Sequence, residues 1–206
     1  MIRVMNPNLA ALLRLMLVTD DALLRGRDLL ALCRDAVRGG VTCVELRLKH
    51  ASPRELLELT RSLIGGLDVP VLVNDRLDVA LAAGAAGVHL GLDDLPVSLV
   101  RRLVPEGFVI GASVGTASEI ASGQGADYWG VGPWRMTRTK ADAGAALGRS
   151  GFRAIVAAAK GIPCVAIGGV TPEDVGEVRA AGGVGVAVVS GILSAANVEE
   201  AASKYR

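Results

Sequence analysis

Residues 71–90 read VLVNDRLDVALAAGAAGVHL and contain one complete strand–helix–strand pattern. The apolar run 71–73 ends in Asn74-Asp75, an amphipathic stretch covers 76–83, and a second short apolar run ends at Leu90. Short apolar runs bounded by turn residues are typical of buried strands. Gly84 follows the amphipathic stretch, as a glycine commonly follows the last turn of a helix. The segment therefore predicts two buried strands joined by a helix.

The same alternation occurs eight times in 206 residues, or about 26 residues for each unit. The predicted strands are Leu15–Thr19, Cys43–Arg47, Val71–Asn74, Gly87–Leu90, Val109–Ser113, Tyr128–Val131, Cys164–Ile167 and Val184–Val189. The predicted helices lie near 27–38, 53–64, 76–83, 97–103, 117–123, 150–160, 173–181 and 191–204. Ser52-Pro53-Arg54-Glu55 and Thr171-Pro172-Glu173-Asp174 have the pattern of capped helix starts.

Eight strand–helix units predict an α/β protein with a single (β/α)8 TIM barrel over residues 1–206. A doubly wound parallel sheet is the alternative. Such a sheet more often has five or six strands, and its first strand commonly leads into a glycine-rich fingerprint. Here the first predicted strand leads into Asp20-Asp21 instead.

The composition excludes several classes of protein. The chain is 51% hydrophobic and its net charge is +1, which disfavours a disordered chain and a general nucleic-acid binder. No apolar run has the length of a membrane helix, and Arg14 interrupts the apolar start. We expect a mature cytoplasmic protein with no membrane or nucleic-acid partner. Cys33, Cys43 and Cys164 have no metal or redox spacing and are expected to be buried reduced thiols.

Charged residues gather at the end of the second predicted strand. Alternation puts Glu45, Arg47 and Lys49 on one side of the chain, and Leu46 and Leu48 on the other. Barrel active sites lie at the carboxyl ends of the strands, and buried charges need partners. Two cations and one anion at this place indicate an anionic ligand such as phosphate. The alternative is a strand end whose charges are solvated.

Carboxylates end the next two strands. Asn74-Asp75 follows the third strand, and Asp93-Asp94 follows the fourth. Mg²⁺ typically takes one or two carboxylates together with substrate phosphates and water, so this pair predicts a magnesium site. Helix capping is the alternative role for each aspartate. His89 is expected to be a packed strand residue.

The remaining strand ends give weaker signals. Ser113 ends the fifth strand, and the longest unassigned stretch, 132–149, contains Thr137, Thr139 and Lys140, which suit an oxyanion-binding loop. A solvated basic loop is the alternative. Gly168-Gly169 and Val189-Ser190 end the last two strands, where this fold commonly binds phosphate through main-chain N–H groups. Tight turns would explain the same glycines.

Two anion sites follow from these residues, one with cations and a metal pair and one built from main chain. An enzyme that joins a diphosphate substrate to a monophosphate substrate fits this division.

The sequence resembles the thiamine phosphate synthase family along nearly its whole length. The resemblance rests on LMLVTD, GGVTCVELRLK, VLVNDRLDVALAAGAAGVHLG, IGASVGT, GADYWGVGP, TRTKADAG, VAIGGV and GVAVVSGI. It implies a (β/α)8 barrel that couples hydroxymethylpyrimidine diphosphate to hydroxyethylthiazole phosphate. The products are thiamine phosphate and pyrophosphate, and the implied reaction is Mg²⁺-assisted and dissociative.

The resemblance also implies roles for individual residues. The pyrimidine diphosphate site would contain Glu45, Arg47, Lys49, Asn74, Ser113 and Lys140, and Mg²⁺ would be held by Asp75 and Asp94. The thiazole phosphate site would contain Thr137, Thr139, Gly169, Val189 and Ser190. Of these residues, the expected catalytic ones are Arg47, Lys49, Ser113 and Lys140.

The sequence departs from the family pattern at a few positions. The family usually has Gln-Leu-Arg-Glu-Lys after the second strand, so Glu45 replaces a glutamine and Leu48 a glutamate. Arg135, Met136 and Arg138 interrupt its usual Pro-Thr-Pro-Thr-Lys loop. A glutamine can both donate and accept a hydrogen bond, whereas an ionised glutamate can only accept.

Two rival functions remain at this stage. A related thiazole tautomerase binds only the thiazole phosphate and has a histidine in place of Pro133. The other rival is a non-catalytic phosphate-binding barrel. Asp75, Asp94 and Lys140 favour the transferase. A homo-oligomer and a carboxylated form of the thiazole substrate are both compatible with the sequence. The sequence does not define physiological regulation.

Overall fold

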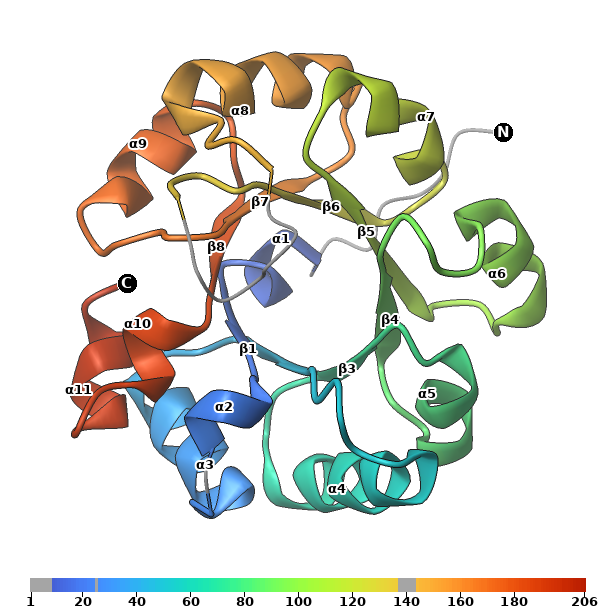
Figure 1. Cartoon of the computed structure of the whole chain (residues 1–206), viewed down its shortest axis with the longest axis vertical. Coiled ribbons are helices and arrows are strands. Elements are labelled where there is room, and N and C mark those ends of the chain that lie inside the picture. Colours follow the sequence, from blue (N-terminus) through green and yellow to red (C-terminus); the bar gives the residue numbers. More distant parts are fainter. Residues whose placement is uncertain (1–8, 25, 137–143) are drawn as a thin grey trace.

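A computed structural model describes residues 9–24, 26–136 and 144–206. Eight parallel strands close into a barrel in the order β1-β2-β3-β4-β5-β6-β7-β8, which confirms the predicted barrel and not the doubly wound sheet (Figure 1). The strands are β1 Leu15–Val18, β2 Cys43–Leu46, β3 Val71–Asn74, β4 Gly87–Leu90, β5 Val109–Val114, β6 Tyr128–Val131, β7 Cys164–Ile167 and β8 Gly185–Val188.

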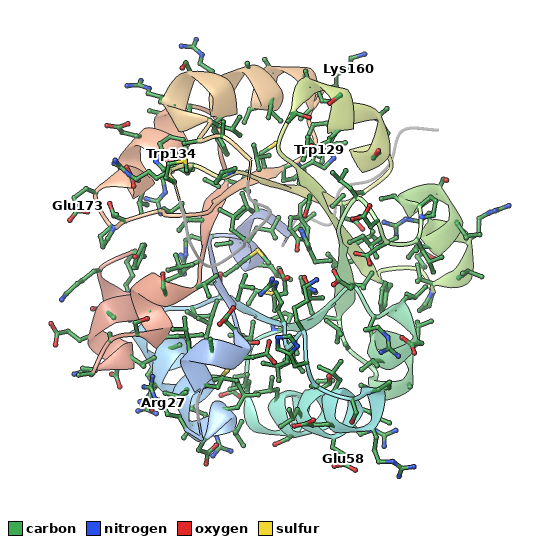
Figure 2. The ribbon with its side chains drawn as sticks, in the orientation of Figure 1. Arg27, Glu58, Trp129, Trp134, Lys160 and Glu173 are labelled. Carbon is green, nitrogen blue, oxygen red and sulfur yellow. The ribbon has the colours of Figure 1, made fainter. Side chains whose placement is uncertain are left out.

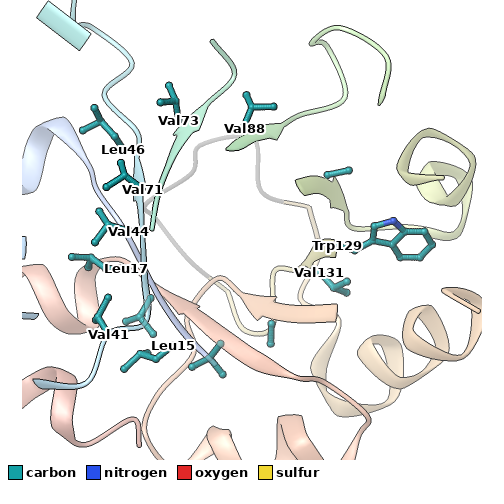
Figure 3. Close-up of a cluster of buried hydrophobic side chains, with 14 of the residues drawn as sticks. Leu15, Leu17, Val41, Val44, Leu46, Val71, Val73, Val88, Trp129 and Val131 are labelled. Atoms are coloured by element: carbon teal, nitrogen blue, oxygen red, sulfur yellow. The ribbon is translucent and has the colours of Figure 1, made fainter. Parts of the chain in front are cut away.

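Side chains alternate between the two faces of the barrel wall. In β1, Leu15 and Leu17 face the helices, whereas Met16 and Val18 belong to a second cluster inside the barrel. Figure 3 shows the outer cluster, with Val44 and Val73 among the aliphatic side chains behind the strands. Because both faces are buried, the strands read as continuous apolar runs.

Most of the helices surround the barrel, whereas α1 lies across its centre in the view of Figure 1. Their bounds are α1 Leu9–Leu12, α2 Asp21–Leu24, α3 Leu29–Gly39, α4 Pro53–Gly66, α5 Leu77–Ala83, α6 Val97–Leu103, the 3-10 turn Ala117–Glu119, α7 Ile120–Gly123, α8 Gly148–Ala158, α9 Asp174–Ala180, α10 Ser190–Leu193 and α11 Val198–Ser203. The predicted start of α4 is confirmed, since Ser52 accepts a hydrogen bond from the Glu55 main chain at 3.2 Å.

The prediction of one helix over 191–204 was wrong. The chain forms α10 and α11 instead, and the Asn197 side chain caps α11 by accepting from the Glu200 main chain at 3.0 Å. The short helices α1 and α2 were not predicted, because four residues are too few to show helical periodicity. At α9 the helix begins at Asp174, two residues later than the proline suggests.

Helix α1 closes the barrel at the amino-terminal ends of the strands. Leu9 and Leu13 belong to the inner apolar cluster, together with Leu72 and Tyr128 from the barrel wall. This packing leaves the opposite end, where the strands point, as the place for a site.

Charged side chains such as Glu58 and Lys160 lie on the outer rim (Figure 2). Within the described ranges, no helix has both the length and the apolar character needed to cross a membrane. The three cysteines are free and buried, as predicted. Burial raises the pKa of the Cys33 and Cys164 thiols to about 12, so both remain protonated near neutral pH.

Candidate active site

A cavity of about 590 Å³ lies at the carboxyl ends of the strands. It brings together every predicted site residue within the described part of the chain: Glu45, Arg47, Lys49, Asn74, Asp75, Asp94, Ser113, Gly169, Val189 and Ser190. Thr137, Thr139, Lys140 and the departure Arg138 lie outside the described residues. Residues from strand ends far apart in the sequence therefore share one cavity, as the barrel rule predicts.

The end of β1 holds the end of β2 in place. The Thr19 hydroxyl accepts from the Arg47 main-chain N–H at 2.8 Å, and Asp20 Oδ2 lies 3.3 Å from Arg47 Nη1. Asp21 accepts from the Lys49 main-chain N–H at 2.8 Å. Sequence reasoning missed these roles, although the position of the two aspartates after a strand was a usable signal.

Lys49 and Asp75 connect the ends of β2 and β3. Lys49 Nζ lies 2.5 Å from Asp75 Oδ2. Asp75 has a left-handed backbone conformation, with φ of 61°, which is uncommon for a residue with a side chain. Strained conformations of this kind gather at functional sites, and this one turns the carboxylate toward the cavity end of the barrel.

Asp75 and Asp94 form a hydrogen-bonded pair of carboxyl groups. Burial raises the pKa of Asp94, and its hydrogen bond with Asp75 raises it further. Burial also raises the pKa of Asp75, but hydrogen bonds with Lys49 and Asp94 outweigh burial and hold it below the ordinary value. Two carboxyl groups this close favour sharing a proton or a cation.

The donor set fits Mg²⁺. Hard carboxylate oxygens converge from two loops, and Mg²⁺ commonly keeps several waters and uses substrate phosphates as further ligands. Within residues 9–24, 26–136 and 144–206, no group of three or more His, Cys, Asp or Glu side chains could hold a metal ion. The pair therefore suits an ion that arrives with a phosphate and not a closed all-protein site.

Glu45 lies inside the barrel, beneath the cations. Its side chain is buried, with 4% of the residue exposed. Burial raises the pKa of Glu45, although His89 and Arg47 act in the opposite direction. The two neighbouring cations pair with other carboxylates, Arg47 with Asp20 and Lys49 with Asp75. Burial thus makes protonation of Glu45 easier than in water, so its carboxyl can donate a hydrogen bond over a wider pH range than that of an exposed glutamate.

His89 is buried, as expected, but it also lines the cavity. Its Nδ1 lies 2.9 Å from the Tyr128 hydroxyl, and its Nε2 lies 3.0 Å from the Ser113 hydroxyl. A lone histidine in an apolar strand gave no local signal of these contacts, because its partners come from β5 and β6.

The other side of the cavity is built from main chain. Gly168 and Gly169, after β7, both have positive φ, 86° and 69°. A Cβ at Gly169 would lie 2.9 Å from Arg135 Cβ, so the chain passes too closely for a side chain. Val189 and Ser190 line the cavity at the start of α10.

The departures from the family pattern lie in different environments. Arg135 forms an ion pair with Asp174, whose carboxylate also accepts from the Thr171 main chain at 2.9 Å. Met136 is 75% exposed, and Leu48 packs partly buried against the outer core. Nothing in the structure explains the exposed methionine.

Comparison with known proteins gives a consistent result. The family model described as thiamine monophosphate synthase matches residues 15–192. The chain belongs to this family.

Two relatives and one solved structure illustrate the similarity. The chain is 46% identical to the thiamine-phosphate synthase of Syntrophomonas wolfei, over 93% of this chain and 94% of that protein. It is also 46% identical to that of Chloroflexus aurantiacus, over 94% and 91%. A thiamine phosphate pyrophosphorylase from Pyrococcus furiosus superposes with a TM-score of 0.86 at 36% identity, covering 97% of this chain and 96% of that one.

These findings confirm the predicted family, the barrel fold and the activity. The chain is a transferase that forms thiamine phosphate.

Proposed function

We propose that the two substrates are hydroxymethylpyrimidine diphosphate and hydroxyethylthiazole phosphate, and that pyrophosphate leaves in a Mg²⁺-assisted dissociative step. One observation carries this proposal. Arg47, Lys49 and the Asp75–Asp94 pair line one side of the cavity, and the Gly168-Gly169 turn lines the other. A site divided in this way offers a charged place for a diphosphate and a main-chain place for a monophosphate.

The charged side would bind and release the diphosphate. The bond between the pyrimidine methylene carbon and the diphosphate oxygen breaks, and the electron pair leaves with pyrophosphate. Arg47 and Lys49 would stabilise the growing negative charge, because their positions are fixed beforehand by Asp20 and Asp75. Lys140 is proposed to contact the same substrate, on the resemblance alone.

Mg²⁺, held by Asp75 and Asp94, would neutralise charge on the phosphate oxygens when bound. The assignment is supported by the two carboxyl groups themselves, which hydrogen-bond each other and both line the cavity.

The main-chain side would orient the second substrate. N–H groups near Gly169 and at the start of α10 suit a phosphate monoester. The ring nitrogen of the thiazole would then donate its lone pair to the pyrimidine methylene cation, and a C–N bond forms. Thr137 and Thr139 are proposed to contact the same phosphate, on the resemblance alone.

The rival reading is a tautomerase that binds only the thiazole phosphate. Pro133 lines the cavity at the position where that rival has a histidine. The test supplies purified protein with both substrates and Mg²⁺ and follows thiamine phosphate by mass. Thiamine phosphate formation supports the proposal. Isomerisation of the thiazole phosphate alone, without coupling, would support the rival.

We also propose a cytoplasmic enzyme whose partners are these two small molecules. Its three free, buried cysteines suit the reducing conditions of that compartment.

A further inference from the structure

We propose that Tyr128 and His89 are positioning residues that hold the Ser113 hydroxyl as a hydrogen-bond donor toward the pyrimidine substrate. The three side chains form a continuous chain, with 2.9 Å from Tyr128 Oη to His89 Nδ1 and 3.0 Å from His89 Nε2 to Ser113 Oγ. The buried end is Tyr128, with 1% of the residue exposed, and the end in the cavity is Ser113.

The barrel wall is shaped around these two rings. Gly111 pairs with Tyr128 in the sheet, and a Cβ at Gly111 would lie 2.3 Å from the Tyr128 ring. A Cβ at Gly130 would lie 3.0 Å from His89 Cε1. Two glycines on neighbouring strands therefore make room for the tyrosine and the histidine. The ring centroids are 5.5 Å apart and the ring planes are tilted by 40°, so the two rings pack against each other.

The direction of the hydrogen bonds follows from the buried end. Burial raises the pKa of the Tyr128 phenol, so its proton is retained and needs an acceptor. Among the described residues, this hydroxyl has one hydrogen-bond partner, His89 Nδ1. If Nδ1 carried the imidazole proton, it would donate to the phenol oxygen and leave the phenol proton without that acceptor.

The imidazole proton is therefore assigned to Nε2, which donates to Ser113 Oγ. Ser113 already accepts a hydrogen bond from the imidazole, so its own proton is free to point into the cavity. Resting on the proposed function, this makes Ser113 a donor to an acceptor atom of the pyrimidine substrate. The three neutral side chains orient the Ser113 O–H group without placing a fixed charge at the site.

The tautomer is measurable without substrate, because the protein has only two histidines. His50 is exposed, so a His50→Gln variant leaves one imidazole in the spectrum. With 15N-labelled histidine at about pH 8.5, above the ordinary pKa of imidazole, we expect a protonated Nε2 and an unprotonated Nδ1. In Tyr128→Phe this preference should be lost. A protonated Nδ1 in the otherwise native protein would overturn the proposal.

Kinetics provide the second readout. Tyr128→Phe should lower kcat about tenfold, which is roughly the effect on a rate of losing one ordinary hydrogen bond, with a smaller change in KM. In a Ser113→Ala background the same substitution should have no further effect on kcat, because it acts through Ser113. An equal fall in both backgrounds would contradict the proposal.

Thr60→Val is the control. It also removes a buried hydroxyl, one that donates to the Leu56 carbonyl at 2.6 Å within α4, and neither residue lines the cavity. We expect a similar loss of Tm and an unchanged kcat. If Tyr128→Phe does not fold, the tautomer of the His50→Gln protein still decides. If the native protein forms no thiamine phosphate, the proposed function fails. The tautomer measurement still tests the hydrogen bonds among Tyr128, His89 and Ser113.

Discussion

Arg135 and Asp174 form a two-pronged ion pair between the segment after β6 and the start of α9. Arg135 Nε lies 2.9 Å from Asp174 Oδ2, and Nη2 lies 2.5 Å from Oδ1. The hydrogen bonds from Arg135 are the main reason that the pKa of Asp174 lies well below its ordinary value. The Arg135 main chain also donates to the Gly168 carbonyl at 2.8 Å. A residue that departs from the family loop pattern thus holds this segment against the proposed phosphate turn.

Arg135→Ala should raise the KM for thiazole phosphate severalfold and leave the KM for pyrimidine diphosphate nearly unchanged. The loss of Tm should be small, because the arginine side chain is 57% exposed and the buried Asp174 carboxylate keeps its hydrogen bonds from Thr171. Steady-state kinetics with each substrate varied in turn measure the split. Arg38→Ala is the control, since Arg38 is an exposed arginine paired with Glu199 on α11. Equal changes in both KM values would contradict this role.

Gly169→Ala should weaken thiazole phosphate binding and spare pyrimidine diphosphate binding. The added Cβ meets the Arg135–Met136 backbone and disturbs the N–H groups of the turn. Gly161→Ala is the matched control, because Gly161 also has positive φ, 95°, but has open space around it. Calorimetry with each ligand should show a selective loss only for the first variant. Both ligands weakened alike would mean that the two-site division is wrong.

Glu45→Gln should stabilise the ligand-free protein increasingly as pH rises. Burial raises the pKa of Glu45 in the folded chain, so the contribution of this carboxyl to the free energy of unfolding is fully present below its unfolded-state pKa, near 4.3. That contribution is lost as pH rises through the folded-state pKa, by about 1.4 kcal/mol for each pH unit between the two pKa values. Glutamine has no such loss. Thermal melts of both proteins across pH 4–9 measure the difference, which a constant offset would contradict.

The same substitution should remove a pH dependence from substrate binding. A neutral Glu45 can donate and accept hydrogen bonds as a glutamine does, whereas the ionised form only accepts. We expect the native KM for pyrimidine diphosphate to rise with pH above that of Glu45→Gln, with kcat of the variant equal or lower. A variant KM above the native value at every pH would show that Glu45 supports the site only as an anion.

Asp94→Asn should lower turnover at least a hundredfold while changing stability by less than about 1 kcal/mol. The Asp94 carboxylate also accepts from the Gly91 main chain at 2.6 Å, and asparagine retains an acceptor for that hydrogen bond. Turnover should therefore fall strongly while Tm stays nearly unchanged. A loss of Tm in proportion to the loss of turnover would favour a loop-capping role over a metal ligand.

The sequence predicted the barrel well, because buried strands and capped helices leave local patterns. Predicted and observed ends of β3, β4, β6 and β7 coincide. The break between α10 and α11 was missed, since the apolar spacing runs through it and only the Asn197 cap marks the new start. Helix α1 was missed because four residues show no helical periodicity. It is stabilised by tertiary packing, in which Leu9 and Leu13 close the inside of the barrel.

The site was predictable where chemistry coincides with a strand end. Arg47, Lys49, Asp75 and Asp94 meet this condition, and the structure brings them to one cavity. The role of His89 was not predictable, because its contacts join residues that are 24 and 39 positions apart. The raised pKa of Glu45 was also not predictable, since it depends on burial by the complete barrel.

The most direct test of the proposed function measures pyrophosphate release by the purified protein, with both proposed substrates present, as Mg²⁺ is titrated in and then removed by a chelator. Release should saturate with Mg²⁺, fall to background in excess chelator and return when Mg²⁺ is restored, with thiamine phosphate formed in equal amount. Full release in excess chelator would contradict the assignment of Asp75 and Asp94.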